Sequence, residues 1–148
     1  MNFTGNKNIL NFEKTAFLCS RKIPAEVVLK SYDWAKEQKE KGICVVCGNH
    51  SQIEKDVFDI LLKGTQPLIL VLARSMKKHW EPKIKKAIEQ ERLLVISPFN
   101  ESTKHITRET ARIRNKYIID ISDHIVVAFK TPGGQLDELL KGKEHSLI

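Results

Sequence analysis

The chain has 148 residues, of which 41% are hydrophobic, and its 25 Lys and Arg against 18 Asp and Glu give a formal net charge of +7. This length predicts one domain with a core that needs neither disulfides nor a metal, and the composition excludes an intrinsically disordered chain. Three cysteines are too few for a secreted disulfide scaffold, and the longest apolar run, 67–73, is too short to cross a bilayer. We therefore expect a cytoplasmic protein without a membrane partner.

Five short apolar runs without period-2 alternation lie at 15–19, 43–46, 67–72, 93–96 and 125–129. Such runs are typical of strands that are buried on both faces, as in a parallel sheet. Amphipathic segments that predict helices alternate with them, at 24–41, 53–63, 81–90 and within 107–121. The alternation predicts an α/β fold: a single doubly wound Rossmann-like domain with a mainly parallel five-stranded sheet. We expect this domain to span 14–141, between a flexible N-terminus at 1–13 and a tail at 142–148.

The residues that follow each apolar run are the first candidates for a binding site, because open parallel sheets bind ligands at the carboxyl ends of their strands. These segments carry small, polar or basic residues, which suit a phosphate-binding rim but are also usual in strand-to-helix loops. They begin at Ser20, Cys47, Ala73, Ser97 and Lys130.

The segment Gly48-Asn49-His50-Ser51 precedes the predicted helix at 53–63. Its small and polar residues would let backbone N–H groups and the helix N-terminus face an anion. Ser51 also predicts an ordinary N-cap, with Glu54 as its capping-box partner, and the two interpretations are compatible. The segment lacks both the Gly-x-Gly-x-x-Gly pattern and the Gly-Lys-Ser/Thr of a P-loop, and no nucleophile with an acidic partner is recognisable beside His50.

Cys44 and Cys47 have the spacing of a redox or zinc pair, but they lie within a predicted strand. Side chains three residues apart on a strand point to opposite faces, and the chain has no second pair to complete a zinc site. We therefore interpret these cysteines as structural and expect neither a metal nor a cofactor.

Basic residues concentrate between 74 and 86 and between 104 and 116. The lysines at 83–86 are best explained as a solvated helix face. The basic residues at 112–116 lie between apolar runs and are therefore the better candidates for binding. Two basic segments at one edge of the sheet would form a surface that follows a phosphate backbone, and His79, Trp80 and Phe99 would offer stacking faces to bases.

Taken in order, these segments resemble the Rossmann-like domain of the DprA/Smf DNA-processing family, which is related to the LOG (lysine decarboxylase-like) proteins. Cys19-Ser20-Arg21 is similar to the family's Gly-Ser-Arg turn, and residues 47–54 are similar to its Ser-Gly-Gly-Ala-x-Gly-Ile-Asp stretch. Residues 93–98 are similar to its Leu-Ile-Ser-Glu segment. Residues 114–122 are similar to its Arg-Asn-Arg-Ile-Ile-x-x-Leu-Ser segment. The similarity spans 15–140. Asn49 and Gln52 replace family glycines, Glu54 replaces Asp, and Lys116 replaces an Arg, which reduces backbone freedom and removes bidentate phosphate geometry.

The resemblance and the basic rim together imply a protein that binds nucleic acid, with single-stranded DNA as the expected partner, as a stand-alone domain that forms a homodimer. Arg21, Arg74, Arg114 and Lys116 are expected to contact phosphate, and Asn115 to orient its segment. The complete set of expected binding residues is Ser20, Arg21, Gly48, Asn49, His50, Ser51, Arg74, Ser97, Arg114, Asn115, Lys116, Gly133 and Gly134.

Two other functions stay open. A closed pocket at the same strand ends would bind a free nucleotide or a nucleotide-derived signal and make the protein a sensor. Residues 132–138 also resemble the Pro-Gly-Gly-x-Gly-Thr-x-x-Glu motif of LOG phosphoribohydrolases, although the Gly-Thr pair is missing, and a plain glycine-rich turn explains them equally well. A hydrolase of nucleoside monophosphates would use Glu138 and Glu54 as its acids. We favour a binding function over an enzyme.

Overall fold

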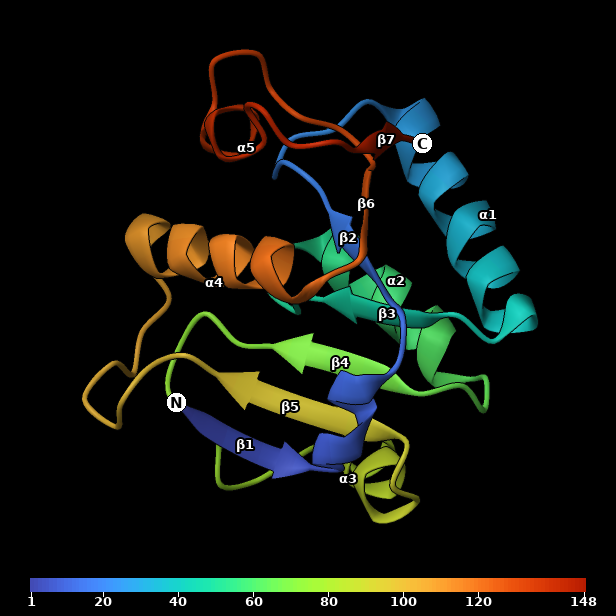
Figure 1. The fold of residues 1–148 in the computed structure, drawn as a ribbon, viewed down its shortest axis with the longest axis vertical. Helices are drawn as coiled ribbons and strands as arrows, with labels where there is room; N and C mark the ends of the chain where they lie inside the picture. Colours follow the sequence, from blue (N-terminus) through green and yellow to red (C-terminus); the bar gives the residue numbers. More distant parts are fainter.

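A seven-stranded sheet forms the centre of the computed structural model, which describes residues 1–148 (Figure 1). The strands are β1 (Asn2–Gly5), β2 (Lys14–Leu18), β3 (Cys44–Cys47), β4 (Leu68–Val71), β5 (Leu93–Ser97), β6 (His124–Val127) and β7 (Ser146–Leu147). Their order is β1-β5-β4-β3-β2-β6-β7, and only β1 runs antiparallel to its neighbour. The predicted α/β fold is confirmed, with the five central strands where the apolar runs placed them; the strand count of five was too low by the two edge strands.

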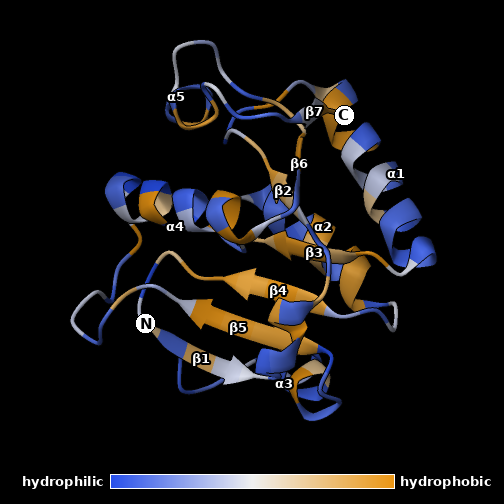
Figure 2. Ribbon diagram, viewed as in Figure 1, coloured by the Kyte–Doolittle hydropathy of each residue, from blue (hydrophilic) through white to orange (hydrophobic).

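Helices cover both faces of the sheet. One face carries α1 (Ala25–Lys41), α2 (Gln52–Leu62) and α3 (Pro82–Glu89), and the other carries α4 (Arg108–Ile121), α5 (Gln135–Leu139) and a 3₁₀ helix (Lys7–Asn11). Because both faces are covered, β3, β4 and β5 are buried along their whole length and lack alternation of polar and apolar residues. Figure 2 shows these three strands as the most hydrophobic part of the ribbon.

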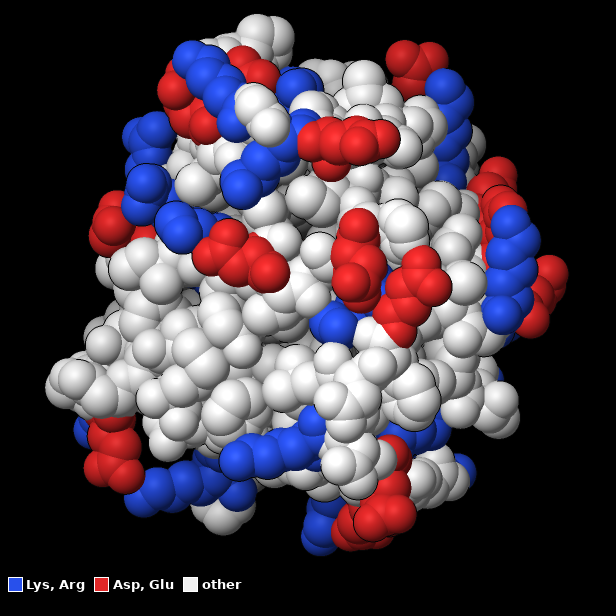
Figure 3. All heavy atoms as spheres, viewed as in Figure 1, with Lys and Arg blue, Asp and Glu red and all other residues white.

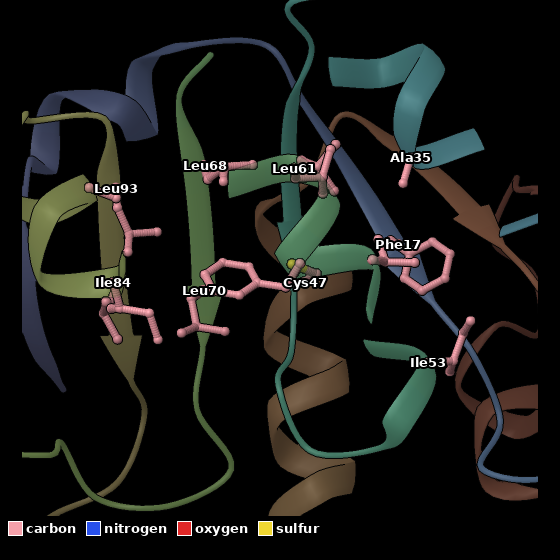
Figure 4. Close-up of a cluster of buried hydrophobic side chains, with 14 of the residues drawn as sticks. Phe17, Ala35, Cys47, Ile53, Leu61, Leu68, Leu70, Ile84 and Leu93 are labelled. Carbon is pink, nitrogen blue, oxygen red and sulfur yellow. The ribbon is translucent and has the colours of Figure 1, made fainter. Parts of the chain in front are cut away.

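The two faces of the sheet have separate hydrophobic cores. In the core beneath α1, α2 and α3, side chains such as Phe17, Leu61 and Leu70 interlock between sheet and helices (Figure 4). Cys47 belongs to this core and Cys44 to the other, so the predicted opposite orientation of the two thiols is confirmed. Burial raises the pKa of the Cys44 thiol to about 11 and also raises that of Cys47, so both stay protonated and packed.

Both ends of the chain, which we expected to be flexible, lie on the sheet. β1 pairs with β5 from Asn2 opposite Ser97 to Gly5 opposite Leu94, and Ile9 in the 3₁₀ helix is only 1% exposed. At the other end β7 pairs with β6, and the Ile148 N–H donates to the Val127 carbonyl at 3.1 Å. These segments are short and mostly polar, so their order depends on partners far away in the sequence. No helix has the length and apolar character that crossing a membrane requires.

Candidate functional site

The loops that follow the central strands meet at one edge of the sheet because β2 to β6 run in the same direction. Two serines hold neighbouring loops together there. The Ser20 hydroxyl accepts a hydrogen bond from the Thr131 N–H at 3.0 Å and so joins the loops after β2 and β6. The Ser97 hydroxyl donates to the Arg74 carbonyl at 2.6 Å and joins the loops after β4 and β5. Ser97 is fully buried, so its hydroxyl serves the loop and does not face solvent.

A cavity of about 310 Å³ opens between the loops that follow β3 and β4; we call it the strand-end cavity. Asn49 and His50 line it from the first loop, Arg74 and Lys77 from the second, and Lys55 from the first turn of α2. The remaining lining residues are Val71, Leu72, Ala73, His79, Trp80, Glu81, Ile84, Ile106 and Arg114. The volume lies at the small end of ligand pockets in proteins.

The charge on this cavity is mostly positive. Lys55, Arg74 and Lys77 make no ion pair in the structure, and Glu81 is the only acidic residue of the lining. By contrast, basic and acidic side chains intermingle over α4 and α5 (Figure 3). Lys116 and Arg112 there pair with Asp120 and Glu109. The cavity is therefore a place where basic side chains remain available to an anion.

A buried ion pair lies at the wall of the cavity, which Arg114 also lines. Nη2 of Arg114, on α4, lies 3.2 Å from Oε2 of Glu54, on α2, and the two side chains are 4% and 9% exposed. The second oxygen of Glu54 accepts from the N–H and the hydroxyl of Ser51, at 3.1 and 2.8 Å, which completes the predicted capping box. Asn115 accepts from Nε of Arg114 at 2.8 Å, so it orients this guanidinium. Glu54 thus fixes the loop after β3 to helix α4.

Gly48 lies where this ion pair crosses the end of β3. A Cβ atom built at Gly48 would overlap both the guanidinium of Arg114 and the carboxylate of Glu54. The position therefore requires glycine for space and not for an unusual backbone conformation, because its φ angle is not positive. We had expected Gly48 to offer its backbone to a ligand; what the structure shows is that its missing side chain makes room for the pair.

His50 lines the cavity and lies among positive charges. Partial burial is the largest cause that lowers its pKa below the usual 6.5, and the nearby cations Arg114, Arg21 and Lys55 lower it further, although Glu54 acts in the opposite direction. His50 is therefore neutral near pH 7 in the free protein. Arg21 is exposed and lies close enough to affect His50, although it does not line the cavity.

Arg114 and Lys116 lie in different surroundings although only one residue separates them. Both are on α4, where positions i and i+2 do not share a face. Arg114 is buried in the ion pair with Glu54, whereas the side chain of Lys116 is 60% exposed, pairs with Asp120 and does not line the cavity. The structure does not bring these two expected phosphate ligands together.

The glycine turn after β6 already binds a carboxylate of its own chain. The Gly133 N–H donates to Asp137 at 2.9 Å, and Nζ of Lys130 lies 3.3 Å from the other oxygen of Asp137. Both contacts lower the pKa of Asp137, and the hydrogen bond from Gly133 is the larger cause. The Gly134 N–H donates to the Thr131 carbonyl at 2.9 Å. Both N–H groups that we expected to bind phosphate are therefore occupied within the loop.

The two acids considered for a hydrolase are also apart. Glu138 is exposed, pairs with Lys141 at 3.0 Å and lines a shallow depression beside Arg108 and Arg112. Glu54 is buried beneath the loop after β3 and lines none of the hollows described here. The geometry does not assemble these two carboxylates around one substrate position.

The sequence did not indicate Lys55 as a site residue, and it indicated His79 and Trp80 only as general stacking partners. Lys55 is four residues from the N-cap Ser51, so its side chain returns to the start of the helix. Helical side chains tilt toward the N-terminus of their helix, so a lysine one turn into a helix that follows a strand can reach the strand end. This position in the sequence could have indicated Lys55.

Comparisons with known proteins agree with this fold. The family model for DNA recombination-mediator protein A matches residues 1–140. DNA processing protein A from Helicobacter pylori is similar over 98% of this chain and 69% of its own, with a TM-score of 0.72 and 16% sequence identity. The same protein from Streptococcus pneumoniae gives a TM-score of 0.74 and 18% identity, over 98% of this chain and 53% of its own. This chain therefore spans little more than half of the second relative.

A third similar structure is the molybdenum cofactor binding protein from Rippkaea orientalis. Its TM-score is 0.60 at 11% identity, over 91% of this chain and 75% of its own. At such identities these structures show the fold that the chains share. No curated protein sequence matches the chain. The Helicobacter pylori structure is described as showing a single-stranded DNA binding mode.

Proposed function

The chain belongs to the family of DNA recombination-mediator protein A, and from this membership we propose that it binds single-stranded DNA at the strand-end cavity. The observation that carries the proposal is the concentration of unpaired basic side chains there: Lys55, Arg74 and Lys77 line the cavity, and none makes an ion pair. The single-stranded DNA binding described for the Helicobacter pylori relative supports the same ligand class.

The chemistry of the lining suits a single strand. Lysine and arginine neutralise phosphates, and the release of condensed counterions then favours binding. His79 and Trp80 add aromatic faces on which bases can stack, and stacking contributes about 1–3 kcal/mol per base. A duplex keeps its base faces covered, so aromatic side chains beside the cations favour an unpaired strand. Neither contact depends on base identity, and we expect little sequence preference.

A charge-matched pair of variants tests this proposal. Lys55→Ala/Lys77→Ala removes two cations from the cavity, and Lys30→Ala/Lys36→Ala removes two exposed cations from α1, outside every hollow described here. The measurement is fluorescence anisotropy with an oligothymidylate of about twelve nucleotides. At about 0.1 M salt we expect the cavity variant to bind roughly 10- to 30-fold more weakly. Each lost phosphate contact makes the plot of log affinity against log salt less steep by about 0.7, and the variant loses two such contacts.

The α1 variant should bind like the wild type to within about twofold. If the wild type shows no binding at low salt, or if the two variants weaken it equally, the proposal is wrong. A thermal unfolding curve of each variant shows whether it is folded; both variants change only exposed lysines.

A free nucleotide is the second candidate ligand, and the small volume of the cavity is the observation that favours it. A ligand that binds only the native state raises the melting temperature by mass action. If a mononucleotide at equal concentration raises the melting temperature as much as the oligonucleotide, the ligand is a free nucleotide and not a strand. We expect a larger rise with the oligonucleotide.

A homodimer stays a prediction. β1 and β7 are the two edges of the sheet, and each has one side without a strand partner. Such edges can pair with a second copy of the chain. Light scattering at micromolar protein concentration would give the mass of one chain or of two.

A further inference from the structure

We propose that the bound single strand leaves the strand-end cavity across the loop after β4 and continues into a second basic depression beside β1. The ligand is then an oligonucleotide that occupies both hollows, and not a single nucleotide. This inference rests on the proposed function and extends it to a surface that includes the N-terminal strand.

The second depression has a volume of about 630 Å³ and adjoins the cavity. Arg74, Lys77 and His79 line both hollows, so the two hollows are adjacent. These three side chains can contact a DNA strand in either hollow. The strand-end cavity reaches the loop after β3, and the second depression reaches the edge strand β1, so a strand that crosses the shared side chains could contact both.

The second depression is basic in its own right. Besides the shared residues, Lys78 and Lys104 line it, and Glu101 is the only acid there. Both lysines are exposed and neither makes an ion pair. Lys78 comes from the loop after β4 and Lys104 from the loop after β5, so side chains from two separate loops converge on the same hollow. A solvated helix face, the ordinary explanation for clustered lysines, does not account for this convergence.

The N-terminal strand completes this depression. Asn2 and Phe3 of β1 line it, and the Asn2 amide donates to the Phe99 carbonyl at 3.1 Å, which fixes β1 to the loop after β5. Phe3 is half-buried, with Nζ of Lys7 over its ring at 4.6 Å. Phe3 also packs against the hydrophobic core on this side of the sheet, so it shapes the depression, and the cations are the groups that face a bound strand.

The test compares two ligand lengths and two charge-matched variants. Lys78→Ala/Lys104→Ala changes the second depression, Lys30→Ala/Lys36→Ala is the control, and the ligands are oligothymidylates of about three and about twelve nucleotides. With the longer ligand at about 0.1 M salt, we expect the depression variant to bind roughly 10- to 30-fold more weakly than the control. Its plot of log affinity against log salt should be less steep by about 1.4, for two lost phosphate contacts.

With the shorter ligand, measured by competition, the depression variant should match the control, because that ligand is held in the cavity alone. If the depression variant binds the longer ligand like the control, or loses the same factor for both lengths, the inference is overturned. These results differ from a failure of the proposed function, in which the wild type binds neither ligand or Lys55→Ala/Lys77→Ala has no effect.

Discussion

The carboxylate of Glu54 lies 3.2 Å from the guanidinium of Arg114 and joins two helices that cover opposite faces of the sheet. The pair passes over the end of β3, at Gly48, and the free oxygen of Glu54 holds the N–H and hydroxyl of Ser51. The loop that carries Asn49 and His50 is therefore fixed in the free protein. A ligand that binds there need not order this loop, which reduces the entropic cost of binding.

Glu54→Gln should lower the free energy of unfolding by about 3 kcal/mol, because it leaves the Arg114 cation buried without a partner. Urea denaturation measures the change. Asp120→Asn is the matched control, since it breaks the exposed pair with Lys116 and should cost no more than about 0.5 kcal/mol. Equal small effects of the two substitutions would show that the buried pair is not important for stability.

Gly48→Ala should destabilise the protein by more than about 2 kcal/mol, because the new methyl group overlaps the ion pair. Gly42→Ala provides the comparison: Gly42 ends α1 at φ 72° with open space around it, so its substitution costs only about 1 kcal/mol of backbone strain. If thermal or urea unfolding finds Gly48→Ala to be the milder change, the space at Gly48 is not limiting.

DNA binding should strengthen as the pH falls from 8 to 5.5. The pKa of His50 is lowered by burial and by neighbouring cations, and a bound phosphate beside it would raise that pKa again. The complex then takes up a proton, and lower pH favours it. In the free protein the sign is opposite: the unfolded chain binds the proton more readily, so the free energy of unfolding falls as the pH drops below about 6.5.

An NMR titration of the His50 ring with and without an oligonucleotide measures both pKa values directly. DNA binding by the His50→Gln variant should depend less on pH than binding by the wild type. His105→Gln changes an exposed residue in the loop after β5 and should leave the pH dependence of binding unchanged. A His50 pKa that stays unchanged on binding would contradict a phosphate at this position.

A thiol reagent at pH 8 should label Cys44 and Cys47 at least about a hundredfold more slowly in the native protein than in urea. Both side chains are buried, and burial keeps the thiols protonated. Cys19 is partly exposed, but burial and the nearby Glu54 raise its pKa to about 12, so it too should react slowly. Mass spectrometry of the labelled peptides distinguishes the three. Fast labelling of Cys47 would mean that the end of β3 opens readily.

Much of the central fold could be predicted from local patterns. Apolar runs indicated the five parallel strands, because strands buried on both faces need continuous hydrophobicity, and Ser51 with Glu54 indicated the start of α2. β1 and β7 gave no such signal, since they are short, polar edge strands that depend on pairing with distant neighbours.

The site was harder to predict because its contacts are distant in the sequence. Nothing near Arg114 indicates that its partner is Glu54, and the sequence therefore suggested a phosphate ligand where the structure has an ion pair. The helical spacing of Arg114 and Lys116 did contain the information that they face different ways. The hollows beside Lys55 and Lys104 depend on the strand order, which brings together loops that are far apart in the chain.

The most direct test of the binding surface is a map of backbone amide chemical shifts on addition of an oligothymidylate of about twelve nucleotides. We expect the largest changes at Asn49, His50, Lys55, Arg74 and Lys77, with further changes at Lys78, Lys104 and β1. The outer face of α1 should not respond. Changes confined to Gly133 and Gly134, or to Arg108 and Arg112, would contradict binding at the strand-end cavity. They would place the ligand in the shallow depression that these four residues line.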